Sequence, residues 1–127
     1  MKFCASDCER LTCHLKKSLY GLKLSGRNWY KTLTDYLVQC GFVESKIDPC
    51  IFIKQDDTKA PVIILFWVDD IIIASDDINV ISEIKLKLGE RFKMDDRAEL
   101  RWFLGIDFKR LDDGSYNMSQ ERYIDKC

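Results

Sequence analysis

The sequence predicts an α+β fold, in which an antiparallel sheet with a central β-hairpin packs against helices. The first observation is a pair of apolar runs, 62–67 and 71–74, that are rich in β-branched residues and have only three residues between them. Such a short connection requires antiparallel strands, which excludes a parallel doubly wound sheet. The second observation is that apolar residues recur at helical spacing over 25–40 and 76–90. Strands and helices are therefore mixed along the chain.

The first half of the chain shows its elements through caps and turn residues. Residues 1–14 lack periodicity, so we expect a poorly ordered leader followed by one domain over 15–127. We expect a helix that Ser25 caps and Gly41 ends. A strand should follow over 50–54, then a polar turn over 56–59, and Pro61 should enter the first central strand.

The second half predicts a helix, a hairpin and a short final helix. Asp76 or Asp77 should cap the helix, which reaches about Glu90. Residues 100–111 and 115–119 should form a single hairpin joined by 112–114, and Ser119 should begin the last helix. The apolar stripe of the longer helix should consist of Ile78, Ile81, Ile84 and Leu88.

Composition fits one ordinary globular domain, with 46% hydrophobic and 32% charged residues in 127. The longest apolar run, 62–68, is far below the roughly 20 residues of a membrane span, and the first 15 residues lack a secretory pattern. We therefore expect an intracellular chain with no membrane partner. The net charge is −1, but five basic residues lie close together, which suits either phosphate contacts or a solvated helix face: Lys16, Lys17, Lys23, Arg27 and Lys31.

Six cysteines raise the question of zinc or disulfides. Cys4, Cys8, Cys13 and His14 lie close together, but their spacing lacks the second ligand pair of a zinc finger. We expect reduced thiols, with Cys40 and Cys50 acting as small core residues.

Asp69 and Asp70 stand between the two apolar runs. Asp is a common turn residue, so the pair is typical of a solvated hairpin loop. Two carboxylates held at the end of a rigid hairpin are also suitable ligands for a divalent metal ion. The spacing alone leaves both interpretations open.

Four segments occur in a characteristic order, followed by YNMSQERYIDK near the end of the chain. They are LKKSLYGLKLSGRNWY at 15–30, IDPCIFI at 47–53, FWVDDIII at 66–73 and RWFLGIDF at 101–108. Together they resemble the reverse transcriptase of Ty1/copia-type LTR retrotransposon Pol polyproteins, over residues 15–127.

The resemblance implies a partial polymerase palm with part of the fingers and the primer-grip hairpin. It implies RNA-directed DNA synthesis on an RNA or DNA template-primer from dNTPs. Asp69 and Asp70 would be the catalytic, metal-binding residues for two Mg²⁺ ions, with Mn²⁺ as an alternative. The partners would include the remainder of the Pol polyprotein, and the place of action would be a cytoplasmic virus-like particle.

The resemblance also assigns residues around the metal site. Nucleotide and template binding falls to Tyr20, Gly21, Lys23, Ser25, Arg27, Trp67 and Val68. Lys23 and Arg27 suit phosphate contacts but are equally typical of surface charge. Primer grip falls to Trp102, Phe103, Leu104 and Gly105, whose aromatic side chains are equally typical of a core.

The family also has a third metal-binding aspartate on a strand upstream of the LKKSLYGLK segment. Asp7 is the only Asp before Leu15, and its surroundings do not predict a strand, so that role is not assigned to it. We therefore expect the isolated chain to be inactive. Two alternatives remain: a non-catalytic remnant, and a nucleic-acid-binding module derived from a retrotransposon.

Three positions depart from the family pattern. Gly26 stands where the family has Pro, Trp67 where it has Tyr, and Ala98 where it has Gly. If position 98 has a positive φ, Ala should cost about 1 kcal/mol or more there.

Overall fold

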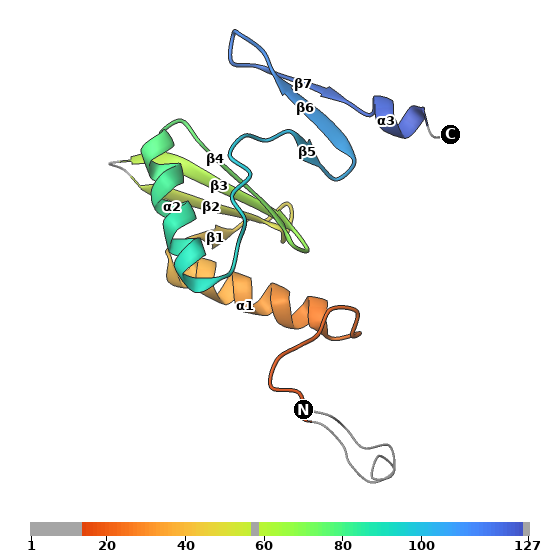
Figure 1. Cartoon of the computed structure of the whole chain (residues 1–127). Helices are drawn as coiled ribbons and strands as arrows, with labels where there is room; N and C mark the ends of the chain where they lie inside the picture. Colours follow the sequence, from red (N-terminus) through yellow and green to blue (C-terminus); the bar gives the residue numbers. More distant parts are fainter. Residues whose placement is uncertain (1–13, 57–58, 126–127) are drawn as a thin grey trace.

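The fold is known from a computed structural model, which describes residues 14–56 and 59–125 (Figure 1). Its described elements are three helices and two antiparallel sheets, ordered β1-β2-β3-β4 and β5-β6-β7. In chain order they are α1 (Ser25–Gln39), β1 (Val43–Glu44), β2 (Ile51–Asp56), β3 (Lys59–Trp67), β4 (Asp70–Ser75), α2 (Ile78–Arg91), β5 (Trp102–Phe103), β6 (Ile106–Arg110), β7 (Tyr116–Ser119) and α3 (Glu121–Ile124).

The core lies between one face of the four-stranded sheet and helices α1 and α2 (Figure 1). Alternate residues of a strand face the same side, so Phe52, Val62, Ile64 and Phe66 all point to the helices. Full burial of one such side chain contributes about 1.5–3 kcal/mol. The remaining members of this core are Leu33, Leu37, Phe42 and Leu88.

The opposite face of the same sheet is apolar but much more exposed. Ile53 lies across from both Val43 and Ile63, and these three side chains are 38%, 70% and 45% exposed, respectively. Trp67 is 54% exposed near one end of this face. Among the described residues, this face therefore has no covering layer comparable to α1 and α2.

Helix α1 begins and ends near the expected places, but Ser25 does not cap it. Leu24 is the N-cap and makes no side-chain capping bond, while Ser25 is the first helical residue. The prediction about Gly41 is confirmed: its φ is +86°, and its N–H donates to Val38 O while the next N–H, of Phe42, donates to Leu37 O. This is a Schellman motif, in which glycine adopts the left-handed conformation at low cost.

Strands β2 and β3 extend further than the sequence predicted. Asp48 Oδ1 accepts from Cys50 N at 2.7 Å and turns the chain into β2. Strand β3 starts at Lys59, two residues before Pro61. The register between β2 and β3 shifts near Asp56, and Pro61 has no partner in the ladders of either neighbouring strand. A proline is tolerated at such an unpaired position of a strand. Strand β1, only two residues long, was too short to show periodicity.

The central hairpin is confirmed, with one correction at its tip. Trp67 pairs with Asp70, so the two-residue turn consists of Val68 and Asp69 rather than the two aspartates. Asp70 is already the first residue of β4. The two carboxylates thus come from different local structures, one in the turn and one on a strand.

Helix α2 is capped by Asp77, whose carboxylate accepts from Asn79 N at 2.8 Å, as expected. The predicted stripe is partly wrong: Ile84 and Leu88 do contact the core, whereas Ile78 is 69% exposed and Ile81 is not among the residues packed against the core. Val80 contacts it as well. The first residue of a helix lies at its end, where the sheet no longer covers it.

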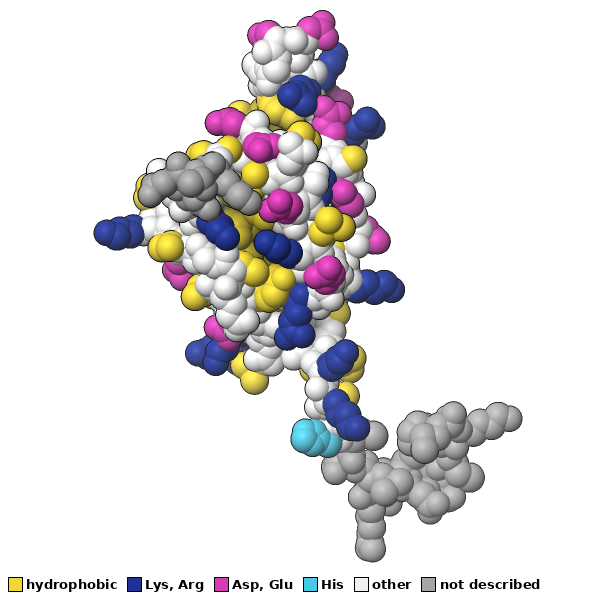
Figure 2. All heavy atoms as spheres, turned by 90° about the vertical axis from the view of Figure 1, so that its left-hand side faces the viewer, with side chains coloured by type: hydrophobic (Ala, Val, Ile, Leu, Met, Phe, Trp, Pro, Cys, Tyr) yellow, Lys and Arg dark blue, Asp and Glu magenta, His cyan; other side chains and the backbone are white. Residues whose placement is uncertain are grey.

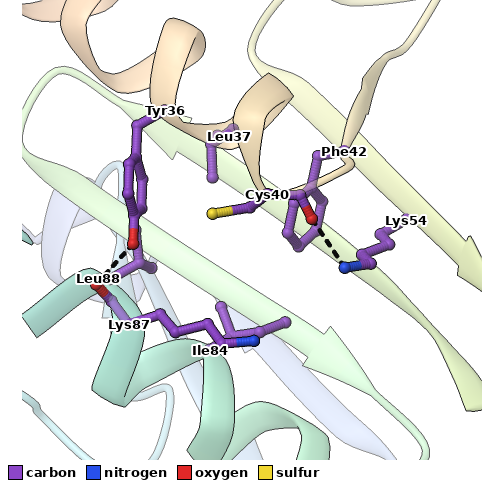
Figure 3. A pocket seen from close by; sticks show the side chains of 8 residues that line it. All are labelled: Tyr36, Leu37, Cys40, Phe42, Lys54, Ile84, Lys87 and Leu88. Atoms are coloured by element: carbon purple, nitrogen blue, oxygen red, sulfur yellow. Dashed lines mark hydrogen bonds between the residues drawn. The ribbon is translucent and has the colours of Figure 1, made fainter.

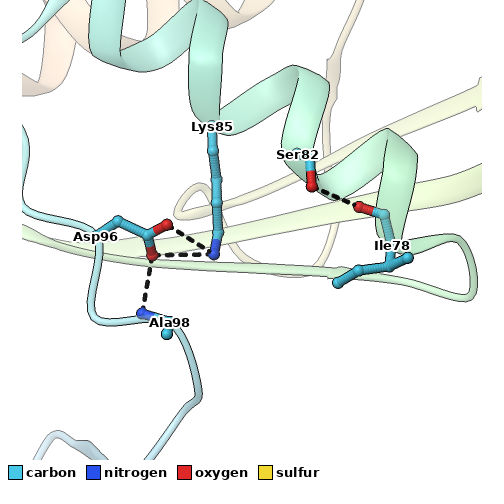
Figure 4. Close-up of polar contacts among 5 residues, drawn as sticks. All are labelled: Ile78, Ser82, Lys85, Asp96 and Ala98. Atoms are coloured by element: carbon cyan, nitrogen blue, oxygen red, sulfur yellow. Dashed lines mark hydrogen bonds and ion pairs between the residues drawn. The ribbon is translucent and has the colours of Figure 1, made fainter.

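The linker between the two sheets is tied to α2 by an ion pair (Figure 4). Lys85 Nζ lies 2.9 Å from Asp96 Oδ1, which also accepts from the backbone N–H of Ala98 at 2.9 Å. Ala98 has a φ of +59°, so position 98 has the positive φ considered in the sequence analysis, a conformation that favours glycine.

The region 100–111 is not one strand. Leu104 and Gly105 have φ values of +50° and +80° and form a tight turn that divides it into β5 and β6. The second hairpin is confirmed, since β6 pairs with β7 around 111–115. In this three-stranded sheet, Phe103 is the buried hydrophobic residue.

Several expectations fall partly or wholly outside the described residues. These are the leader over 1–14, of which only His14 is described, Cys4, Cys8 and Cys13, part of the turn 56–59, and the last two residues. Cys40 and Cys50 are free thiols, but they are half-buried rather than part of the buried core that the sequence predicted for them. No helix within the described ranges is long and apolar enough to cross a membrane.

Helix α3 follows Ser119, whose hydroxyl accepts from Glu121 N at 3.1 Å.

Candidate active site

The turn between β3 and β4 has an unusual backbone. Val68 has a φ of +54°, while Asp69 does not have a positive φ, which is the φ pattern of a type II′ hairpin turn. Glycine is the usual residue at that position, and a β-branched residue there is strained. Such strain persists only where surrounding contacts hold the conformation, and it is common at functional sites.

Two carboxylates lie at this end of the hairpin, one in the turn and one at the start of β4. Asp69 and Asp70 are both exposed, and Asp70 lies on the same side of the sheet as its cross-strand partner Trp67, away from the core. Carboxylate oxygens are the ligands that Mg²⁺ prefers, and one or two of them with substrate phosphates are a common protein contribution. The donor chemistry of the pair therefore fits a hard divalent cation. Within the described residues, no group of three or more His, Cys, Asp or Glu could hold a metal ion.

Helix α1 contacts the turn from the core side. The indole nitrogen of Trp29 donates to the carbonyl oxygen of Val68 at 2.6 Å, across 39 residues of sequence. On the next position of the helix, the Tyr30 hydroxyl donates to Pro49 O at 3.1 Å, and its ring lies 5.7 Å from that of Phe66. Burial raises the pKa of Tyr30, so its hydroxyl stays protonated and continues to donate.

A cavity of about 240 Å³ lies beside the turn. Three residues named in the sequence analysis line this cavity: Gly26, Trp67 and Val68. Cys50 also lines it, and burial, with the nearby Asp48 carboxylate, raises the pKa of this thiol. Cys50 is therefore a neutral, weakly nucleophilic group at neutral pH.

The loop before α1 holds the predicted nucleotide-binding residues. Gly21 has a φ of +88°, which allows the chain to turn between Leu19 and Leu22. Ser25 Oγ donates to Leu19 O at 2.5 Å, so its role here is to fasten the loop to the helix. Tyr20 is 90% exposed on this loop. The loop therefore presents Tyr20 to solvent with its own backbone fixed.

The basic residues of this region are all exposed: Lys16, Lys17, Lys23, Arg27 and Lys31. No Asp or Glu occurs between residues 11 and 34. Figure 2 shows Lys and Arg side chains beside His14, while on the main body they are mixed with Asp and Glu. Local charge at the start of α1 is thus positive although the whole chain is close to neutral.

The predicted primer-grip residues belong to the second sheet. Trp102 and Leu104 are 44% and 49% exposed, and Phe103 is 6% exposed. Leu104 and Gly105 form the tight turn between β5 and β6. The structure therefore separates the four into one buried residue and three on the surface or in the turn.

A second cavity, of about 150 Å³, lies between the end of α1 and α2 (Figure 3). The Tyr36 hydroxyl donates to Lys87 O at 2.8 Å, and Lys54 Nζ donates to Cys40 O at 2.7 Å. Both bonds tie neighbouring elements together across this cavity. It lies about two helical turns from Trp29, and none of the predicted site residues lines it.

Two residues of the site were not recognised from the sequence. Trp29 lies within the helix that apolar spacing predicts over 25–40, and Asn28, whose Nδ2 donates to Ser18 Oγ at 3.0 Å, is one residue before it. Nothing in the spacing of 29 and 68 predicts that they meet, because the contact depends on the angle between α1 and the sheet.

Comparison with known proteins gives a consistent family assignment. Residues 3–127 match a family model described as reverse transcriptase (RNA-dependent DNA polymerase). No solved structure matches the chain.

Three relatives illustrate the similarity. A retrovirus-related Pol polyprotein from transposon RE1 of Arabidopsis thaliana is 41% identical over 122 residues, which cover 96% of this chain and 8% of the relative. The corresponding polyprotein from transposon RE2 of the same plant is 36% identical, over 95% of this chain and 8% of the relative. A Ty1-GR3 Gag-Pol polyprotein from Saccharomyces cerevisiae is 38% identical over 104 residues, 75% of this chain and 6% of the relative. The chain thus spans less than a tenth of these relatives.

Proposed function

The chain belongs to the reverse transcriptase family, as a segment of a Ty1/copia-type Pol polyprotein, and from this we propose that it is the part of the polymerase palm that carries two of the metal-binding carboxylates. In the intact protein it would contribute to RNA-directed DNA synthesis from dNTPs on an RNA or DNA template-primer. The observation that carries the proposal is the tight, strained turn with Asp69 and Asp70 exposed beside each other.

Asp69 and Asp70 would hold the metal ions, Mg²⁺ or alternatively Mn²⁺. When bound, two such ions activate the attacking 3′-hydroxyl and stabilise charge on the leaving pyrophosphate. The protein's part is to hold both carboxylates in place before substrate arrives. A two-residue turn closed by the Trp67–Asp70 pair supports that role, since it leaves little freedom to either aspartate.

The site would be completed by residues outside this segment. Strand β4, which begins at Asp70, is at the edge of the four-stranded sheet. The backbone N–H and C=O groups on its outer side are therefore available to another strand. We propose that an upstream strand of the polyprotein adds there and brings the third carboxylate of the family close to Asp70. The isolated chain would then lack polymerase activity.

Substrate contacts would come from the start of α1. The exposed Tyr20 and the fixed turn at Gly21 would face the incoming nucleotide and the template, together with Trp67 and Val68 at the tip of the hairpin. Lys23 and Arg27 would contact phosphates, because they are exposed in a region without acidic residues. Trp102, Leu104 and Gly105, with Phe103 buried beneath them, would contact the primer end.

The test is template-dependent dNTP incorporation by a polymerase made of this segment joined to the upstream and downstream polyprotein. We expect Asp69→Asn and Asp70→Asn to reduce incorporation by at least about 100-fold. Asp76→Asn is the matched control, because Asp76 is an exposed aspartate just beyond the other end of β4. Undiminished activity in Asp69→Asn, or incorporation by the 127-residue chain alone, would contradict the proposal.

The exposed basic residues support a second candidate, a nucleic-acid-binding module without catalysis. It predicts salt-dependent binding of an RNA–DNA duplex that Asp69→Asn leaves unchanged, and no incorporation in the longer protein. We further propose that the working location is a cytoplasmic virus-like particle, on the strength of the retrotransposon relatives alone.

A further inference from the structure

We infer that Trp29 is a positioning residue that fixes the turn carrying Asp69 and Asp70. The inference rests on the proposed metal-binding role of that turn. Its basis is the 2.6 Å hydrogen bond from the indole nitrogen to Val68 O, which joins the second turn of α1 to the residue of the hairpin that has a positive φ.

The bond sets the orientation of one peptide group. The chain has no cis peptide among its described residues, so the carbonyl of Val68 and the N–H of Asp69 point in opposite directions. With the carbonyl held toward α1, the N–H of Asp69 is directed away from the helix. Because this peptide group is fixed, the direction in which the Asp69 side chain leaves the backbone is restricted as well.

The turn needs such a contact. Val68 is β-branched and sits at a φ of +54°, from which an unrestrained turn would relax to a negative value. Rotation of the Val68–Asp69 peptide would break the bond to Trp29. The indole therefore opposes the movement that would carry Asp69 away from Asp70.

Trp29 is itself held from the other side. Its ring meets the ring of Phe92 edge-on at 5.3 Å, and Phe92 meets Tyr36 in the same way at 5.3 Å. The Tyr36 hydroxyl donates to Lys87 O, so the aromatic series continues into α2. An indole packed in this way has few alternative rotamers, so its N–H stays directed at Val68.

The same helix also fastens the loop that would bind the nucleotide. Ser25 and Asn28 bond Leu19 and Ser18 of that loop, and Trp29 follows directly on α1. The first turns of α1 thus set the position of the loop and of the metal-binding turn together. A shift of α1 would move both at once.

The experiment uses the full 127-residue chain with two replacements at position 29. Trp29→Phe removes the N–H and part of the ring, and replacement of Trp29 by benzothienylalanine removes the N–H while keeping the shape. Lys54→Met is the matched control, because it removes one hydrogen bond, to Cys40 O at the far end of the same helix, and leaves the aromatic series intact. The readouts are the NMR signals of Val68 and Asp69 and the affinity for Mn²⁺, with Asp69→Asn as the reference for loss of the site.

We expect both replacements at position 29 to shift or broaden the Val68 and Asp69 signals and to weaken Mn²⁺ binding about tenfold, as for other outer contacts of metal ligands. Lys54→Met should leave both readouts unchanged even if it lowers the melting temperature. Unchanged Val68 and Asp69 signals in the benzothienylalanine protein would overturn the inference. If wild type and Asp69→Asn bind Mn²⁺ equally, the proposed function fails by itself, and the NMR signals still decide the role of Trp29.

Discussion

The two sheets of this chain differ in how they are supported. The four-stranded sheet buries eight hydrophobic residues in one cluster with α1 and α2, whereas the three-stranded sheet buries Phe103 alone among its described residues. Figure 1 shows both helices on the first sheet, with the second sheet beyond the linker. The first sheet can hold a strained turn because a core fixes it from one side. The second sheet has much less support from a core of its own.

The difference also separates the two proposed halves of the site. The turn with Asp69 and Asp70 lies on the sheet that has its own core, and Trp102 to Gly105 lie on the other. Metal ligands need fixed geometry, whereas a surface that grips the primer can become ordered on binding. The following predictions test whether the contrast between the sheets is real.

The largest effect should come from the core of the first sheet. Phe52 is fully buried and lies against Phe66, so Phe52→Ala should lower the free energy of unfolding by about 3–5 kcal/mol. Met118→Ala, on an exposed position of β7, should change it by less than about 0.5 kcal/mol. Urea unfolding monitored by circular dichroism measures both. Similar losses in the two variants would refute the contrast.

Amide hydrogen exchange should show the same contrast without mutation. The N–H groups of β3 should exchange at least about 100-fold more slowly than those of β6 and β7, because opening β3 requires opening the core. Exchange followed by NMR at pH 7 gives each rate. Equal protection in the two sheets would mean that the second sheet has support that its burial does not reveal.

A smaller effect is expected in the linker. Ala98 has a φ of +59°, so Ala98→Gly should stabilise the chain by about 1 kcal/mol through relief of strain. Gly89→Ala is the reverse substitution at a helical position: a Cβ there meets nothing within 4 Å, and the change should also stabilise the chain, by about 0.5–1 kcal/mol. Thermal unfolding measures both shifts. Destabilisation by Ala98→Gly would show that the linker does not hold this conformation.

The smallest effect concerns pH. The hydrogen bonds from Lys85 and from Ala98 N lower the pKa of Asp96 below its usual range. Because the folded pKa is depressed, this contact stabilises the linker above the unfolded-state pKa and is lost as the pH falls through the folded value. Asp96→Asn should therefore remove a small part of the acid sensitivity measured by urea midpoints between neutral and low pH. The Asp96 side chain is 59% exposed and that of Lys85 is 33% exposed, so solvent ions reach the pair and the effect should also shrink in high salt.

Local patterns predicted much of the first sheet. Gly41 and Asp77 mark their helix ends because each acts through bonds to residues within five positions. The β-branched apolar runs located β3 and β4, although a run that is apolar throughout does not indicate which face is buried. The sequence also predicted the strain at residue 98, from the family pattern rather than from any local signal.

The errors arose where distant parts meet or where a turn lacks its usual residues. Leu104 at a positive φ concealed the turn between β5 and β6, since leucine rarely adopts that conformation. Val68 also has a positive φ, and the turn of the hairpin therefore lies one residue earlier than the predicted pair of aspartates. The bond from Trp29 to Val68 depends on tertiary packing, which no periodicity encodes.

The position of Asp70 at the start of β4 determines which mutations in a gene copy would misplace its carboxylate. Asp70 faces away from the core, whereas Ile71 and Ile73 contact it, and this order depends on the two-residue period of the strand. One codon inserted between Asp70 and Ile71 would turn the carboxylate toward the phenylalanines of the core. In-frame insertions and deletions at this point should therefore inactivate a gene copy more surely than most substitutions around it.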